Sequence, residues 1–242
     1  MILRNTDELG KLGESLSRVY ITVVLAMSAD GKIADRDRTA ARFSSREDLL
    51  HLETEIAQAD AVLFGAGTLR AYGTCLSVRQ PILIAQRQAH QKPDQPIQIV
   101  CSRSGQISPT LRFFQQPVPR WLLTTQQGAS AWTQQDKFDR ILSLLQVPTN
   151  WPDILQTLQH QGIQKLTVLG GGELVADFMQ QNLIDEMHLT VCPLLIGGYT
   201  APTPCDGDGV PVELAPKLQL IQVKPLGDEV FLQYRRCHPE KD

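Results

Sequence analysis

Several short, almost wholly apolar segments constrain the fold of this chain more than any other feature. Residues 19–26 read VYITVVLA, residues 61–66 read AVLFGA, and residues 165–169 read KLTVL directly before three glycines. Runs of this length that are rich in β-branched residues are typical of strands buried on both faces. Such strands belong to parallel sheets with helices on both sides, so the sequence predicts an α/β fold.

Helical patterns alternate with these strands. In residues 45–59 the apolar side chains recur at helical spacing, and Ser44 or Ser45 is placed to cap the helix. Residues 151–161 are expected to form an amphipathic helix with Pro152 in its first turn, and residues 173–181 a further helix after the glycines.

Other segments predict the remaining strands. Residues 186–195 are expected to form a long strand, and the alternating segments 216–223 and 229–235 an antiparallel pair. Shorter strands are expected at 120–125 and 140–145. The segments PILIA (81–85) and PIQIVC (96–101) are either one false and one true strand or two short strands.

These patterns predict a single domain over residues 19–242. Its mostly parallel central sheet has flanking helices and antiparallel C-terminal strands. Residues 1–18 carry a weak amphipathic pattern, which predicts an N-terminal arm or helix.

The composition excludes several classes of protein. The chain has 242 residues, 42% of them hydrophobic, and a net charge of −3, so no nucleic-acid partner is expected. No apolar run reaches the roughly 18–20 residues of a membrane span, and the N-terminus lacks the apolar core of a signal peptide. We therefore expect a cytoplasmic protein without a membrane partner. The five cysteines form no C-x-x-C pair.

Polar or glycine-rich corners follow three of the predicted strands. Gly170, Gly171 and Gly172 precede a helix, which is the arrangement that binds phosphate at free backbone N–H groups. Thr68 closes a second glycine corner, and Ser102-Arg103 at a third strand end suits a phosphate monoester. Tight or solvated turns would explain each corner alone, but strand ends of one sheet predict a shared crevice.

The Asp30-Gly31-Lys32 segment follows the first strand. Asp-Gly is ordinary turn chemistry, so a simple corner is one interpretation. The other places Lys32 beside a ligand, as a cation for phosphate or as a proton donor.

Two other catalytic patterns fail. His51-Leu52-Glu53 fits the H-x-E of zinc deaminases, but Asp208 stands where the second cysteine of P-C-x-x-C belongs. No G-x-S-x-G elbow is present either. No metal is expected.

Five motifs in order resemble the reductase family of riboflavin biosynthesis. They read MSADGKIA (27–34), SSREDLL (44–50), DAVLFGAGTL (60–69), GGGELVADFMQQNLIDEMHLTVCPLLIGG (170–198) and APT with DGDG (201–209). The resemblance implies a dihydrofolate-reductase-like fold and a homodimer. It also implies NADPH-dependent reduction of a ribosylamino-pyrimidine 5′-phosphate, in which hydride passes to the sugar C1′ and the ribosyl group becomes ribityl.

The resemblance also implies roles for individual residues. Thr68, the three glycines and Glu173 would hold NADPH, and Ser102 and Arg103 would face its 2′-phosphate. Lys32 would be catalytic beside the reacting ribose, and the substrate would contact Asp30 and Ser44.

The chain departs from the family at two places. Leu169 stands where many relatives carry an acid before the glycines, and Tyr72 and Gly73 stand where relatives carry two aspartates. Two alternatives therefore remain beside the riboflavin reductase. One is a reductase of this fold with another small substrate, and the other is a non-catalytic NADP(H)-binding module.

Overall fold

The computed structural model describes residues 18–237. The predicted arm or helix at 1–18 lies outside the described residues, apart from Arg18. The strands are β1 (Tyr20–Ser28), β2 (Ala61–Gly65), β3 (Ile97–Ser102), β4 (Arg120–Thr124), β5 (Arg140–Leu142), β6 (Lys165–Val168), β7 (Glu186–Cys192), β8 (Leu218–Leu226) and β9 (Glu229–Arg236).

The helices connect these strands. They are α1 (Arg46–Gln58), α2 (Ala66–Tyr72), α3 (Pro81–Ala89), α4 (Gln126–Ser130), α5 (Trp151–His160) and α6 (Gly172–Gln180), with short 3₁₀ turns η2 (Arg112–Gln115) and η3 (Val212–Leu214). Among the described residues, no helix is both long and apolar enough to cross a membrane.

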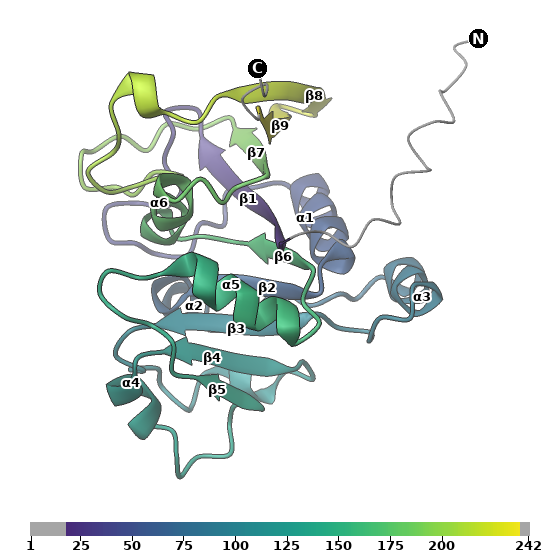
Figure 1. The fold of residues 1–242 in the computed structure, drawn as a ribbon. Coiled ribbons are helices and arrows are strands. Elements are labelled where there is room, and N and C mark those ends of the chain that lie inside the picture. Colours follow the sequence, from purple (N-terminus) through teal and green to yellow (C-terminus); the bar gives the residue numbers. More distant parts are fainter. Residues whose placement is uncertain (1–17, 238–242) are drawn as a thin grey trace, which may run out of the picture.

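The nine strands of the described residues form one sheet in the order β5-β4-β3-β2-β6-β1-β7-β9-β8 (Figure 1). Strands β1 to β7 pair in parallel, and β9 runs antiparallel to both β7 and β8. The predicted fold class is therefore confirmed.

Two hydrophobic cores lie on opposite faces of the sheet, because strand side chains alternate. On β2, Leu63 packs with residues of α5 and α6 on one face. Its neighbours Val62 and Phe64 pack with residues of α1, α2 and α3 on the other. Figure 1 shows α5 in front of the sheet and α1 and α2 behind it.

The N-terminus of α1 is capped by Ser45. The Ser45 hydroxyl accepts a hydrogen bond from Asp48 N at 3.1 Å. Glu229 from the start of β9 accepts hydrogen bonds from both the backbone N–H and the hydroxyl of Ser45. The C-terminal hairpin therefore fixes the helix that follows β1.

The structure decides one open alternative and corrects the length of one strand. For the segments at 81–85 and 96–101, the alternative of one false and one true strand is confirmed, because Pro81 begins α3, in which Leu83 and Arg87 share the buried face, while the second segment forms β3. The strand expected at 186–195 is shorter, because β7 ends at Cys192, and it lies inside the sheet between β1 and β9. In the part of the chain that the structure describes, the open edge of the C-terminal half is β8.

Candidate active site

One large cavity opens at the carboxyl ends of the central strands. Its volume is about 940 Å³. Segments from the ends of β1, β2, β3 and β6 line it, together with α1 and the loop before it, α2, the start of α6 and the loop after β7. Since strand ends are where open parallel sheets bind ligands, this cavity is the candidate site.

The glycine corner after β6 presents a bare helix terminus to the cavity. Gly171 is the N-cap of α6, and no side chain of the described residues caps the helix. A Cβ atom on Gly171 would meet nothing nearer than Thr68 Oγ1 at 4.0 Å. The backbone is held by a hydrogen bond from Gly65 N to Gly170 O at 3.0 Å. Unfilled space over free N–H groups is what a phosphate requires.

The next glycine has the opposite environment. A Cβ atom on Gly172 would collide with the Thr203 carbonyl oxygen and the Asp206 carboxylate. Asp206 also donates its backbone N–H to Gly172 O at 3.1 Å. Gly172 is therefore required for packing of the loop after β7, while Gly171 is open to a ligand.

A cationic corner lies where β3 ends. Ser102, Arg103 and Ser104 line the cavity, and Arg70 from α2 lines it beside them. The corner is fixed by hydrogen bonds from the Thr124 and Thr125 hydroxyls to Arg103 O. No hydrogen bond or ion pair involves the Arg103 guanidinium within residues 18–237. Two guanidinium groups beside hydroxyls suit a phosphate monoester.

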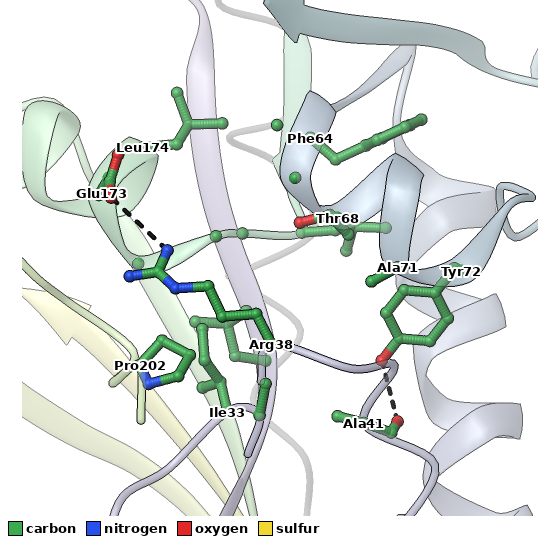
Figure 2. A pocket seen from close by; sticks show the side chains of 18 of the residues that line it. Ile33, Arg38, Ala41, Phe64, Thr68, Ala71, Tyr72, Glu173, Leu174 and Pro202 are labelled. Carbon is green, nitrogen blue, oxygen red and sulfur yellow. Dashed lines mark hydrogen bonds and ion pairs between the residues drawn. The ribbon is translucent and has the colours of Figure 1, made fainter. Parts of the chain in front are cut away.

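The loop between β1 and α1 forms the opposite wall. Figure 2 shows Arg38 reaching Glu173 across this wall, with Arg38 Nη1 lying 3.6 Å from Glu173 Oε1. Tyr72 of α2 donates its hydroxyl to Ala41 O at 2.9 Å (Figure 2). Two contacts thus tie this loop to the helices that carry the glycine corners.

Cysteines on the cavity wall are protonated thiols. Burial raises the pKa of Cys75 and of Cys101 to about 12. Thiols in this state are poor nucleophiles at neutral pH, so the cavity offers no activated cysteine.

Eight of the ten predicted site residues line this cavity: Ser44, Thr68, Ser102, Arg103, Gly170, Gly171, Gly172 and Glu173. Asp30 and Lys32 are not among its lining residues. Lys32 Nζ donates to Ala201 O at 3.3 Å, next to Pro202, which does line the cavity. The catalytic role of Lys32 stays a prediction.

Asp30 fastens the loop after β7. Its carboxylate accepts hydrogen bonds from the Ser28 hydroxyl and from the backbone N–H groups of Ile196 and Gly197. These bonds lower the pKa of Asp30 to about 2, so the group is ionised at neutral pH. Its observed contacts join the end of β1 to the β7 loop.

Several polar lining residues were not predicted from the sequence, and three of them bear on the proposed site. Arg70 and Arg79 line the cavity, as does Asp48, which is 5% exposed. The sequence does contain a signal for Arg70. Glycine is the residue that most often ends a helix in the left-handed conformation, as Gly73 does, so it indicates that a helix carrying Arg70 follows Gly65. Asp48 is in the first turn of a helix that the sequence predicts, but its burial depends on the tertiary fold.

Comparison with known proteins identifies the family. The profile of the RibD C-terminal domain matches residues 19–232. The chain belongs to this family. It is 30% identical over 197 residues to the 2,5-diamino-6-ribosylamino-4(3H)-pyrimidinone 5′-phosphate reductase of Archaeoglobus fulgidus, covering 79% of this chain and 88% of that protein. As a RibD C-terminal domain protein, it is an oxidoreductase of riboflavin biosynthesis.

Two further relatives describe the extent of the likeness. The riboflavin biosynthesis protein RibD of Bacillus amyloliquefaciens is 26% identical, and the match covers 96% of this chain but 62% of RibD. A pyrimidine reductase-like protein of Corynebacterium diphtheriae has the same fold, with a TM-score of 0.77 and 18% identity over 91% of this chain and 92% of that one. The dihydrofolate-reductase-like architecture is confirmed.

Proposed function

We propose that this chain reduces a ribosylamino-pyrimidine 5′-phosphate to its ribityl form with NADPH as reductant. The observation that carries the proposal is the single cavity in which the open glycine corner and the cationic Ser102-Arg103 corner meet. NADPH carries phosphate at two places, a pyrophosphate and a 2′-phosphate, and each corner suits one of them.

The dinucleotide fits the residues that are present. The bare N-terminus of α6 and the open space over Gly171 would receive the pyrophosphate. Arg103, Arg70 and Ser102 would receive the 2′-phosphate. No acidic side chain follows Ser102-Arg103 directly, where an NAD-selective site would place one for the ribose 2′-hydroxyl. Bound NADPH would supply the hydride to the sugar C1′.

The wall formed by the β1–α1 loop and α1 would then receive the substrate. Ser44 offers a hydroxyl there, and Asp48 is the only buried acid among the lining residues. Arg79 has no hydrogen-bond or ion-pair partner for its guanidinium within the described part of the chain, so it is available to the substrate phosphate. Opening of the ribose ring breaks the C1′–O4′ bond and requires a proton at O4′, which is the role proposed for Lys32.

An assay with three substrate classes tests the proposal. NADPH oxidation is followed with the ribosylamino-pyrimidine phosphate, with dihydrofolate, and with simple carbonyls or imines. We expect turnover with the first compound only. Turnover with another class alone would assign a different substrate to the same fold. The observation that favours this second candidate is the apolar Leu169 at the cavity wall. NADPH binding without turnover on any class would favour a non-catalytic module.

A further inference from the structure

A cluster of two histidines and a carboxylate lies apart from the cavity, between α1 and β7. His51 and Glu55 are one helical turn apart on α1, so both side chains lie on the same face. His188 comes from the middle of β7 and is 4% exposed. None of the three lines the cavity. Within residues 18–237 this is the only group of three or more His, Cys, Asp or Glu side chains close enough to share one ion.

The three ligand atoms have the spacing of a metal site. They all lie within 4.8 Å of one another. His188 Nδ1 is 3.4 Å from Glu55 Oε2, and His51 Nε2 is 3.9 Å from Glu55 Oε1. Tetrahedral zinc with bonds of about 2.0–2.1 Å holds neighbouring ligand atoms roughly 3.3 Å apart. Small side-chain shifts would therefore close the three atoms around an ion.

Each imidazole directs toward Glu55 a nitrogen that makes no hydrogen bond within the described residues. His51 Nε2 and His188 Nδ1 are buried, and neither has a hydrogen-bond partner within the described residues. Buried polar nitrogens nearly always have a hydrogen-bond partner. Two that have none and face the same carboxylate therefore point to an ion that binds between them. A cation between them would satisfy both.

The outer contacts of His188 also match a metal ligand. Its other nitrogen, Nε2, lies 3.2 Å from Glu186 Oε2. Arg235 in turn donates to Glu186 Oε1 at 2.9 Å. A metal-bound histidine commonly donates a hydrogen bond from its second ring nitrogen to a carboxylate. This bond fixes the ring and turns the other nitrogen toward the ion. The Phe231 ring packs against His51 with ring centroids 4.0 Å apart, which holds the second imidazole.

We propose that His51, Glu55 and His188 bind a zinc ion that fastens α1 to β7. Nitrogen and carboxylate ligands suit Zn²⁺, and three protein ligands leave one position for water. The side chains of His51 and Glu55 are 21% and 14% exposed, so an ion can enter from solvent. The same helix lines the cavity through Asp48, Leu49 and Leu52, so the ion holds one wall of the active site in place.

A metal-free ion pair is the competing account. Burial disfavours a charge on His188, but the carboxylates of Glu186 and Glu55 outweigh it and raise the pKa of His188 to about 9. A protonated His188 between two carboxylates would need no metal. That account predicts no stoichiometric zinc binding.

Metal binding by the full chain decides between the accounts. The protein is stripped with a chelator, and Zn²⁺ or Co²⁺ alone is titrated while calorimetry and the Co²⁺ absorption spectrum are recorded. We expect one equivalent per chain and a tetrahedral Co²⁺ spectrum without thiolate charge-transfer bands, since the cluster has no cysteine. Zn²⁺ should also raise the thermal midpoint, because it binds only the folded chain.

Variants at the partly exposed ligands keep the test independent of folding. His51→Gln and Glu55→Gln should each weaken binding more than tenfold, and Glu186→Gln about 10- to 100-fold through loss of the outer carboxylate. His160→Gln, an exposed histidine in the last turn of α5, is the matched control and should bind as the parent does. Absence of binding in the parent, thiolate bands, or equal affinity in His51→Gln and His160→Gln would overturn the proposal. No readout depends on the reductase activity.

Discussion

Gly171 and Gly172 are neighbours in sequence, yet a side chain at each would have a different effect. Added atoms at Gly171 enter the cavity, and added atoms at Gly172 strike the loop that carries Thr203 and Asp206. We predict that Gly171→Val folds with a normal thermal midpoint and loses NADPH binding by collision. Gly172→Ala should instead lower stability. Titration of NADPH and thermal unfolding of both variants check this, and retained NADPH affinity in Gly171→Val would contradict it.

The proposed role of Arg103 is to select NADPH over NADH. A guanidinium that meets the 2′-phosphate makes a charged hydrogen bond, so Arg103→Ala should weaken NADPH binding by about 1.5–3 kcal/mol. NADH lacks this phosphate and should lose much less. Arg36→Ala, at an exposed arginine paired with Asp37, is the control and should change neither affinity. Equal losses for both dinucleotides in Arg103→Ala would remove the assignment.

A substitution at Lys32 tests whether the turn after β1 contributes to the reaction. If Lys32 acts on the substrate, Lys32→Ala keeps the NADPH dissociation constant and lowers turnover. A solvated turn residue would alter stability by less than about 0.5 kcal/mol and turnover not at all. Because Lys32 Nζ contacts Ala201 O beside the cavity, we expect the first result. Full activity of Lys32→Ala on an established substrate would rule out the role.

At the scale of elements, α3 depends on one buried cation. Arg87 is 2% exposed and donates to the carbonyl oxygens of Ala57, Ala59 and Pro93. Arg87→Ala leaves these acceptors without their donor, and we expect a loss of about 3 kcal/mol in the free energy of unfolding. Urea unfolding measures the change, with the exposed Gln86→Ala of the same helix as control. A loss similar to that of the control would show that the carbonyls find other donors.

The sequence predicts most elements because their patterns are local. A local pattern is one that a few neighbouring residues determine. Examples are the apolar runs of the buried strands, the cap at Ser45 and the alternation in β8 and β9. The sequence alone does not distinguish helix from strand in residues 81–85, because a five-residue apolar run fits either. The helix is decided by a tertiary contact, the burial of Arg87 against backbone carbonyls of α1 and of the loops that follow α1 and α3. The strand-end corners with Thr68, Ser102-Arg103 and the three glycines are predictable because parallel strand ends share one edge, whereas the site roles of Ser44 and Glu173 rest on the family resemblance. The cluster of His51, Glu55 and His188 could not be found, because only the fold brings β7 under α1.

At the scale of the whole molecule, the outer strand β8 is the feature that an isolated chain leaves incomplete. Among residues 18–237, only one of its sides pairs with a strand, β9. All of its residues but Leu226 are exposed. They include Leu218, Leu220, Ile221 and Val223, with Val230 of β9 beside them. Exposed apolar edge strands are rare in stable monomers, and two-fold pairing is the commonest way to cover them.

We therefore predict a homodimer formed through β8. Light scattering at micromolar concentration should give twice the 26.9 kDa mass of one chain. The double substitution Leu220→Glu and Val223→Glu places like charges opposite each other across a two-fold interface. This variant should be a monomer that keeps its fold. Ile82→Glu, at an exposed apolar residue of α3, is the matched control and should stay dimeric. A parent mass of one chain would contradict the dimer. A dimer that survives the double substitution would move the interface away from β8.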